Sequence, residues 1–200
     1  MTLAALIVLA FLVGSIPFGV LVGRIFFNTD IRTSGSGNIG AANALRTYGK
    51  RAGVAVLVLD ALKGFVPVWT ATALFGDSHW PAVGAAIAAL VGHCYSPWLG
   101  GRGGKGVATH LGALLALSPL AGLAFAATWL AAALPTGYSS VGSLVGTLVS
   151  VVALTWLLGP AGLAYGAFAA AVIGWRHRAN LQRLRAGTEN AMSLFDRWTI

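Results

Sequence analysis

Long apolar runs separated by short polar segments dominate the pattern of this 200-residue chain. A membrane-spanning helix needs about 20 predominantly apolar residues, with a range of about 17 to 25. The apolar runs of the chain are Leu3–Gly23, Ala52–Phe75, Trp80–Leu99, Val107–Leu134, Val141–Leu158 and Ala161–Trp175. Their lengths and number predict an all-α integral membrane protein that folds as one helical bundle.

The run Val107–Leu134 has two interpretations, because Ser118-Pro119 lies near its middle. It is either one long kinked helix or two short helices. Loops on the cytoplasmic side collect Lys and Arg, so the 13 bases separate the alternatives. With two crossings and the N-terminus outside, twelve of the 13 bases are cytoplasmic and the other, Lys63, lies within a span. With one crossing, the five arginines of the C-terminal tail would lie outside.

The charge pattern therefore favours a seven-transmembrane-helix bundle with its N-terminus outside and its C-terminus in the cytoplasm. Residues 1–200 would form a single domain. The segment Val107–Leu117 fits this scheme least well, since at 1.5 Å per residue it is only about 16 Å long. Such a helix would reach half the membrane depth and would need neighbouring helices to shield its end.

Composition excludes a water-soluble domain. The chain is 57% hydrophobic and 9% charged, whereas about a quarter of the residues in soluble domains are charged. The net charge of +8 would suggest nucleic acid in a soluble protein. Here the bases flank apolar spans, so membrane lipids and anionic ligands explain them and no nucleic-acid partner is expected. The single cysteine, Cys94, allows no internal disulfide.

The segment Thr33–Arg46, TSGSGNIGAANALR, is the first of four polar clusters at the predicted cytoplasmic face. Glycine turns let backbone amides approach an anion, and a guanidinium suits phosphate. A loop built only for flexibility would need neither asparagines nor an arginine. The candidate ligand groups are Gly35, Ser36, Asn38, Asn43 and Arg46.

The second cluster lies within Gly92–His110, where the glycines of GGRGGKG frame two bases and precede an apolar run. A glycine-rich backbone, a lysine and a helix N-terminus together form a phosphate cradle. No Ser or Thr follows Lys105, so this is not a Walker A motif and nucleotide hydrolysis loses support. A cytoplasmic anchor with glycine turns is the alternative. The candidate residues are Gly103, Gly104, Lys105 and Gly106.

The remaining two clusters come late in the chain. Thr136–Ser143 is a hydroxyl-rich turn that offers Ser139 and Ser140. The segment Trp175–Glu189 begins where the last span ends, and most of its arginines are interpreted as reaching lipid phosphates. His177 and Asn180 are three residues apart, so one helical face presents both. Glu189 is the only acid near these bases, and we expect it to form a buried ion pair with an arginine.

One pair of ionisable residues lies inside a predicted span. Asp60 and Lys63 are three residues apart, and burying either alone is costly, so we expect a structural ion pair. The chain lacks the H-x-x-x-x-D, G-x-S-x-G and H-E-x-x-H motifs and any acidic cluster for a divalent metal. No metal site and no cofactor are therefore expected.

Three of the polar segments resemble the three motifs of a known family, in order and along nearly the whole chain. SGSGNIGAANALR, GHCYSPWLGGRGGKGVATHLG and RHRANLQRLRAGTE are similar to those of the bacterial acyl-phosphate:glycerol-3-phosphate acyltransferases, the PlsY family. Asp60–Gly64 and Gly137–Ser140 also look like family features. One departure is Ala42, where the family usually has threonine, and we expect this to remove a local hydrogen bond without abolishing activity.

The resemblance implies a seven-helix enzyme that transfers a fatty acyl group from acyl phosphate to the sn-1 hydroxyl of glycerol 3-phosphate. The products would be lysophosphatidate and phosphate, in the first step of bacterial phospholipid synthesis at the cytoplasmic membrane. Acyl-CoA and acyl carrier protein would not serve as donors. The carried-over catalytic residues are Ser36, Arg46, Lys105, His177 and Asn180, with Gly103, Gly104 and Gly106 as backbone donors.

The general base stays open at this point. His177 has an ordinary pKa of about 6.5, but Arg176 and Arg178 beside it are expected to lower that pKa. A substrate phosphate could accept the hydroxyl proton instead, with His177 as a phosphate ligand. Two functions of other classes compete: an organic-anion transporter, which would need repeat symmetry and polar groups through the midplane, and a non-catalytic scaffold for anionic lipid.

Overall fold

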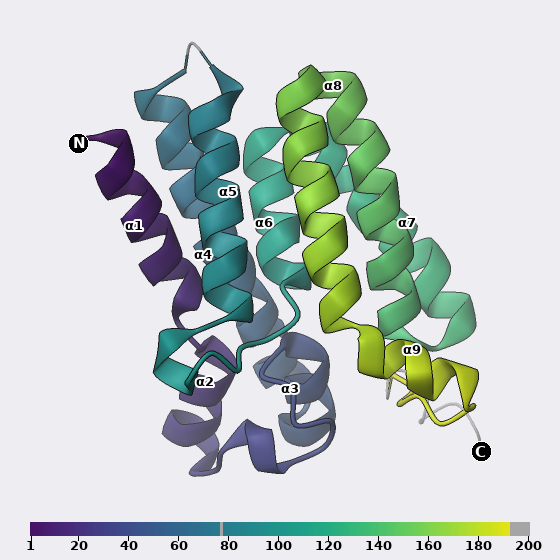
Figure 1. The fold of residues 1–200 in the computed structure, drawn as a ribbon. Coiled ribbons are helices and arrows are strands. Elements are labelled where there is room, and N and C mark those ends of the chain that lie inside the picture. The colour runs from purple at the N-terminus through teal and green to yellow at the C-terminus, as the bar shows by residue number, and fades with distance from the viewer. Residues whose placement is uncertain (77, 193–200) are drawn as a thin grey trace.

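The computed structural model describes residues 1–76 and 78–192, which form helices and connecting loops (Figure 1). Arg197, one of the five tail arginines of the charge argument, lies outside the described residues, as do Asp77 and Asp196. The elements in chain order are α1 (Leu3–Ser15), α2 (Phe18–Phe27), the 3-10 helix η1 (Ile31–Thr33), α3 (Ala41–Tyr48), α4 (Lys50–Leu74), α5 (His79–Cys94), the 3-10 helix η2 (Pro97–Leu99), α6 (Val107–Leu117), α7 (Pro119–Thr136), α8 (Ser139–Arg176) and α9 (Arg178–Arg185).

The first predicted span, Leu3–Gly23, is broken rather than continuous. Helices α1 and α2 meet at an angle of 41°, with Ile16 and Pro17 between them. Proline lacks an amide hydrogen and clashes with the preceding turn, so it favours a kink or a break in a helix. The break frees the carbonyl of Ile16, which accepts a hydrogen bond of 2.7 Å from Nζ of Lys63.

The run 107–134 consists of two helices, which settles one part of the alternative left open above. Helix α6 has 11 residues and ends at Ser118, whose hydroxyl caps α7 by accepting from the amide of Ala121. In the described part of the chain, four helices are long and apolar enough to cross a membrane, or five if the bent pair α1–α2 counts as one span. Helix α6 is shorter than these.

Helix α8 contains both late apolar runs, 141–158 and 161–175, as two antiparallel arms. Its backbone leaves the helical region at Gly159, where φ is 57° and ψ is −137°, just before Pro160. A Cβ built on Gly162 would lie 2.0 Å from the Leu154 carbonyl oxygen, and one on Gly166 would lie 3.0 Å from Cα of Val151. The two arms therefore pack backbone to backbone at these glycines.

Glycine also sets the contact between α4 and α6. A Cβ on Gly64 would lie 2.0 Å from the Thr109 carbonyl oxygen, and one on Gly112 would lie 1.8 Å from that of Ala61. Small residues let membrane helices approach this closely. The contact holds the short helix α6 inside the bundle, where its first turn reaches the site described below.

A buried chain of hydrogen bonds ties α6 to both arms of α8. His110 lies 3.0 Å from the Tyr165 hydroxyl through Nδ1 and 3.0 Å from the Ser150 hydroxyl through Nε2. Ser150 donates its own proton to the Thr147 carbonyl at 2.7 Å, so it accepts from Nε2–H. It follows that Nδ1 has no proton and accepts from Tyr165.

Tyr165→Phe is expected to lower stability by about 1 kcal/mol, the usual size of one interhelical hydrogen bond in a membrane protein. The measurement is thermal unfolding of the purified protein in detergent. Thr155→Val is the matched control, because that hydroxyl bonds within its own arm, to the Val151 carbonyl. Equal stability of Tyr165→Phe and the native chain would contradict a stabilising role for the hydrogen-bonded chain.

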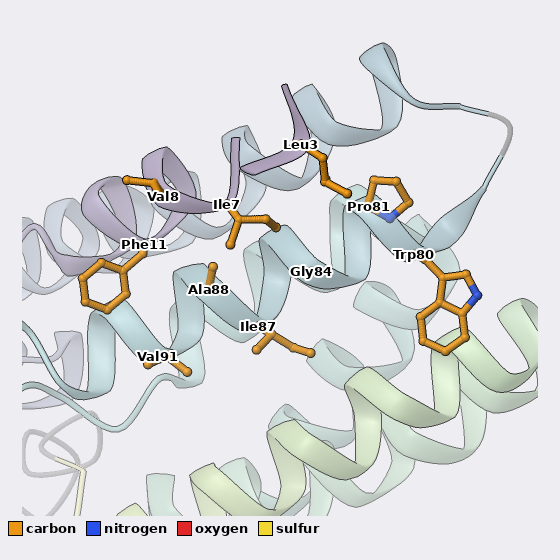
Figure 2. A pocket seen from close by; sticks show the side chains of 10 residues that line it. All are labelled: Leu3, Ile7, Val8, Phe11, Trp80, Pro81, Gly84, Ile87, Ala88 and Val91. Carbon is orange, nitrogen blue, oxygen red and sulfur yellow. The ribbon is translucent and has the colours of Figure 1, made fainter. Parts of the chain in front are cut away.

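An apolar groove of about 640 Å³ runs between α1 and α5 (Figure 2). Side chains of Ile7 and Phe11 on α1 face Ile87 and Val91 on α5 across it. The groove is lined by apolar and aromatic side chains, so it offers no group that binds phosphate. The polar chemistry of the chain lies elsewhere.

Candidate active site

The four polar clusters predicted from the sequence gather at one end of the bundle. In Figure 1, α3, α9 and the loop between α5 and α6 lie at the lower end, and the N-terminus lies at the upper end. They surround a cavity of about 590 Å³. Its polar lining includes Ser36, Asn38, Asn43, Arg46, Lys50, Lys105, Ser139, His177, Asn180, Arg183 and Glu189, and its apolar lining includes Val54, Leu57, Leu111, Phe125, Ala126, Trp129 and Leu130.

The loop before α3 is shaped by Asn43, which is buried. Its Nδ2 donates to the carbonyls of Ile31, Ser34 and Asn38 at 3.2, 3.0 and 2.9 Å, and its Oδ1 accepts from the Ser36 amide at 2.9 Å. These bonds occupy the side chain. Asn43 lines the cavity, but these bonds show that it also folds the loop that presents Ser36, and its predicted contact with substrate stays a prediction.

Gly35 and Asn38 also serve this loop. Gly35 has φ of 57°, and a Cβ there would lie 2.3 Å from Oδ1 of Asn43, so only glycine fits. Gly35 is not among the residues that line the cavity. The Asn38 side chain accepts from the Gly40 amide at 2.9 Å. Both positions support the shape of the site.

Arg46 and Ser36 face the cavity together. Nη2 of Arg46 lies 3.4 Å from the Ser36 hydroxyl, and the arginine lies in the last turn of α3. Burial lowers the pKa of the Arg46 guanidinium from its ordinary value, with Glu189 acting in the opposite direction. An arginine that has lost part of its water gains more from an anion than a fully hydrated one does.

The glycine-rich loop contributes less backbone to the cavity than its sequence suggested. The amide of Gly103 donates to the Cys94 carbonyl at 3.2 Å, and that of Gly104 donates to the His93 carbonyl at 3.0 Å. Both amides are thus occupied, and neither residue lines the cavity. The prediction of Gly103 and Gly104 as anion donors was wrong, because the loop folds back on the end of α5.

Lys105 and Gly106 do line the cavity. Gly106 has φ of 87° and is the N-cap of α6, so the N-terminus of that helix opens beside the lysine. The pKa of Lys105 is lowered to about 8, mainly by burial; Glu189 opposes this shift, while Arg183 and Arg46 contribute to it. A buried ammonium beside two guanidinium groups is stabilised by an anionic ligand, because the anion supplies the compensating negative charge.

His177 is buried at the junction of α8 and α9. Its Nδ1 lies 2.8 Å from the Ile173 carbonyl, and since a carbonyl only accepts, Nδ1 carries the proton. In the neutral ring Nε2 is therefore an acceptor. Burial, then Lys105, lowers the pKa of His177 to about 4. Arg176 acts in the same direction more weakly, so the predicted lowering is present but burial is its main cause.

Glu189 binds together the hydroxyl turn and α9. Its Oε1 accepts from Ser140 at 2.9 Å and from Nδ2 of Asn180, and its Oε2 accepts from Nε of Arg183 at 2.8 Å. Burial raises the pKa of Glu189, but these hydrogen bonds outweigh it and hold that pKa below its ordinary value. The expected ion pair with an arginine is present, and Ser140 is engaged in it.

One polar atom of the Asn180 side chain is available to bind a ligand. Its Oδ1 is buried and has no hydrogen-bond partner within residues 1–76 and 78–192. Buried polar atoms are rarely left unpaired in native structures. Asn180 lines the cavity together with His177, so the predicted shared face of these two residues points into the site.

The expected Asp60–Lys63 ion pair is also present, with Nζ 2.7 Å from Oδ1 and both side chains 1% exposed. The sequence did not indicate that Asp60 and His93 would line the cavity. Nδ1 of His93 lies 3.8 Å from Oδ1 of Asp60, and its ring packs under Gly104. Periodicity along α4 and α5 could not reveal which buried face borders the site.

Arg183 and the apolar lining were missed for different reasons. Arg183 was grouped with the arginines that reach lipid phosphates, but it lines the cavity beside Glu189. Phe125, Trp129 and Leu130 on α7 look in sequence like any lipid-facing positions. The indole of Trp129 donates to the Ser143 hydroxyl at 3.3 Å, which fixes this wall against α8.

Comparison with known proteins identifies the family of this chain. The family described as Glycerol-3-phosphate acyltransferase matches residues 4–187. The glycerol-3-phosphate acyltransferase of Agrobacterium fabrum is 48% identical over 95% of this chain and 91% of its own length. That of an Anaeromyxobacter species is 50% identical over 94% of this chain and 95% of its own.

Two solved structures of PlsY (YgiH), an integral membrane glycerol 3-phosphate acyltransferase, are similar to this chain. The glycerol 3-phosphate form has a TM-score of 0.93 and 36% identity, and it covers 99% of both chains. The lysophosphatidic acid form has a TM-score of 0.87 and 37% identity over 94% of both. With the family match over most of its length, this chain belongs to the PlsY family of integral membrane glycerol-3-phosphate acyltransferases.

Proposed function

We propose that this enzyme transfers a fatty acyl group from acyl phosphate to the sn-1 hydroxyl of glycerol 3-phosphate, releasing lysophosphatidate and inorganic phosphate. This would be the first step of phospholipid synthesis in the bacterial cytoplasmic membrane. The related PlsY structures are described as glycerol 3-phosphate and lysophosphatidic acid forms, which supports the acceptor and the product. Acyl phosphate as donor, in place of acyl-CoA or acyl carrier protein, is our inference from the motifs.

One observation carries the proposal: a single cavity of about 590 Å³ is lined both by bases and by apolar side chains. The bases include Arg46, Lys105 and Arg183, and the apolar lining includes Leu111, Phe125 and Trp129. Two phosphorylated substrates, one of which carries a long hydrocarbon chain, match such a lining. Neither a phosphate site alone nor an apolar groove alone would accept both.

In the proposed reaction the sn-1 oxygen attacks the acyl carbonyl carbon, an ester C–O bond forms, and the bond between that carbon and the phosphate oxygen breaks. Arg46 and Lys105 hold the phosphates and stabilise developing negative charge. Ser36 and Asn180 orient phosphate or carbonyl oxygens, with Gly106 at the helix N-terminus. Acyl phosphate is already an activated anhydride, so a covalent enzyme intermediate is not required.

The proton of the attacking hydroxyl is assigned to a phosphate oxygen of the substrates. Nε2 of neutral His177 can accept a hydrogen bond from that hydroxyl and orient it. The low pKa of about 4 makes His177 a weak base at neutral pH, and this favours the phosphate as final proton acceptor. Substantial turnover by His177→Gln, whose amide oxygen can still accept a hydrogen bond, would support this division of roles.

We further propose a single domain with seven membrane crossings, the N-terminus outside, and the site at the cytoplasmic surface. The seven crossings would be the bent pair α1–α2, the helices α4, α5, α6 and α7, and the two arms of α8. Exposed tryptophans support two boundaries, with Trp98 and Trp175 at the site end and Trp80 and Trp156 toward the other. For the test, Arg185 is replaced by cysteine in a Cys94→Ala background. A thiol reagent that does not cross membranes should label this cysteine only after the membrane has been opened, so that the reagent reaches the cytoplasmic side.

The decisive test uses the purified protein in detergent with acyl phosphate and glycerol 3-phosphate, and it measures phosphate release over time. Release that requires both substrates is the expected result, also in the presence of a chelator, since no metal is invoked. Liposomes that take up glycerol 3-phosphate without any release would point to the transporter. Binding of anionic lipid with neither release nor uptake would point to the scaffold.

The pH dependence of kcat/KM follows from Lys105. With a pKa of about 8, its ammonium is present below pH 8 and is lost as the pH rises through that value, so activity should fall there. Lys105→Arg, whose guanidinium stays charged, should move this fall to higher pH. An unchanged basic limb in Lys105→Arg would assign it to another group.

A further inference from the structure

The arginine that ends α8 does not extend toward lipid. Arg176 is half-buried, and its Nε donates to the Gly104 carbonyl at 2.9 Å while its Nη2 donates to the Gly103 carbonyl. Its guanidinium also lies 5.6 Å from the ring centroid of Tyr95. The general interpretation of the tail arginines as lipid contacts is therefore wrong for this residue.

The loop that precedes Lys105 is consequently held from two directions. The amides of Gly103 and Gly104 donate to the last residues of α5, Cys94 and His93. Their carbonyls accept from Arg176, on α8. Gly103 and Gly104 are thus each held through both their amide and their carbonyl, and Lys105 follows directly in the chain.

Arg176 is also joined by one peptide bond to His177. We propose that Arg176 is a positioning residue, which locks the glycine-rich loop to the end of α8 and so fixes Lys105 relative to His177 and Asn180. This inference rests on the proposed function for its catalytic meaning, because it assigns phosphate binding to Lys105. Its structural part, the restraint on the loop, stands on the hydrogen bonds.

The planar guanidinium can donate two hydrogen bonds at once, in the geometry that the two carbonyl oxygens require. Nε and Nη2 donate to the oxygens of adjacent residues at the same time, and a lysine ammonium can keep the charge without reproducing this geometry. Substitution by lysine therefore separates the effect of charge from that of geometry. Both carbonyls would also lose their donors in Arg176→Ala, which frees the loop.

The chain offers a matched control two residues away. Arg178 is exposed, donates to the Trp175 carbonyl at 3.2 Å, and lies 4.6 Å over the Trp175 ring. These contacts are to a residue only three positions earlier in the chain, and Arg178 neither bonds to the glycine-rich loop nor lines the cavity. Removing Arg178 removes the same charge two residues further along the chain.

The first measurement is steady-state kinetics of phosphate release by Arg176→Ala, Arg176→Lys and Arg178→Ala. We expect KM for glycerol 3-phosphate to rise at least tenfold in Arg176→Ala, less in Arg176→Lys, and less than twofold in Arg178→Ala. Native values in Arg176→Ala, or equal losses in Arg176→Ala and Arg178→Ala, would overturn the proposal, because the effect would then be absent or due to charge alone.

The second measurement needs no substrate. The rate at which a water-soluble amine reagent modifies Lys105, followed by mass spectrometry, should rise severalfold in Arg176→Ala or Arg176→Lys and stay native in Arg178→Ala. If the native enzyme releases no phosphate, the proposed function fails while this measurement still tests the loop. If Arg176→Ala does not fold, Arg176→Lys gives the result, and native labelling in it would overturn the restraint.

Discussion

Lys105→Met is expected to lower kcat/KM for acyl transfer by a hundredfold or more. The change keeps most of the side-chain volume and removes the ammonium that we assign to a substrate phosphate. Loss of one preorganised group that stabilises developing charge costs about 10²–10³ in rate. The effect should be large here because Lys105 is partly withdrawn from water, where charge interactions are less screened. Phosphate release with saturating acyl phosphate measures it.

The control for this prediction lies on the same loop. Arg102 is exposed and does not line the cavity, so Arg102→Met should keep activity within about threefold of the native enzyme. Equal activity of Lys105→Met and the native enzyme would remove Lys105 from the mechanism. Equal losses in Lys105→Met and Arg102→Met would show that the loop acts through its total charge.

Asp60→Asn is expected to destabilise the protein by about 3–5 kcal/mol, the usual cost of leaving one partner of a buried ion pair unpaired. Both side chains of the Asp60–Lys63 pair are 1% exposed. After the change Lys63 would retain the Ile16 carbonyl but no anion. Thermal unfolding in detergent, with unfolding in mixed micelles as a second measurement, should show the loss.

The double variant Asp60→Asn/Lys63→Met provides the test of cause. Removing both charges should restore most of the stability that Asp60→Asn loses, although the Ile16 carbonyl then lacks its donor. If the double variant is no more stable than Asp60→Asn, the loss comes from the shape or hydrogen bonding of the carboxylate. The ion pair would then not be its source.

Much of the fold could be predicted because membrane constraints act on local sequence. Apolar length located the helices, since a spanning segment must satisfy its own backbone hydrogen bonds. Ser118-Pro119 and Gly159-Pro160 marked two breaks correctly. The break at Pro17 was missed, because proline is tolerated in membrane helices and its effect depends on which group donates a hydrogen bond to the freed carbonyl. Here that partner is Lys63, 47 residues later in the chain.

The candidate site, like the fold, could be predicted from the sequence only in part. Residue type and spacing identified Ser36, Arg46, Lys105, His177 and Asn180, all of which line one cavity. Spacing could not tell which polar groups remain free. Asn43, Gly103 and Gly104 are engaged in hydrogen bonds within the loops, and Arg176 binds backbone that lies more than 70 residues earlier.

By itself the sequence determined a helical membrane protein with glycine-supported bases and, through its motifs, the family. Those features depend on apolar length, local spacing and residue chemistry, all of which are readable along the chain. The tertiary structure alone decided which hydrogen-bond donors stay available, which apolar face of α7 lines the cavity, and which arginine binds the backbone of the glycine-rich loop. These outcomes depend on contacts between residues distant in the chain, and a periodic pattern carries no information about the partner across a packed interface.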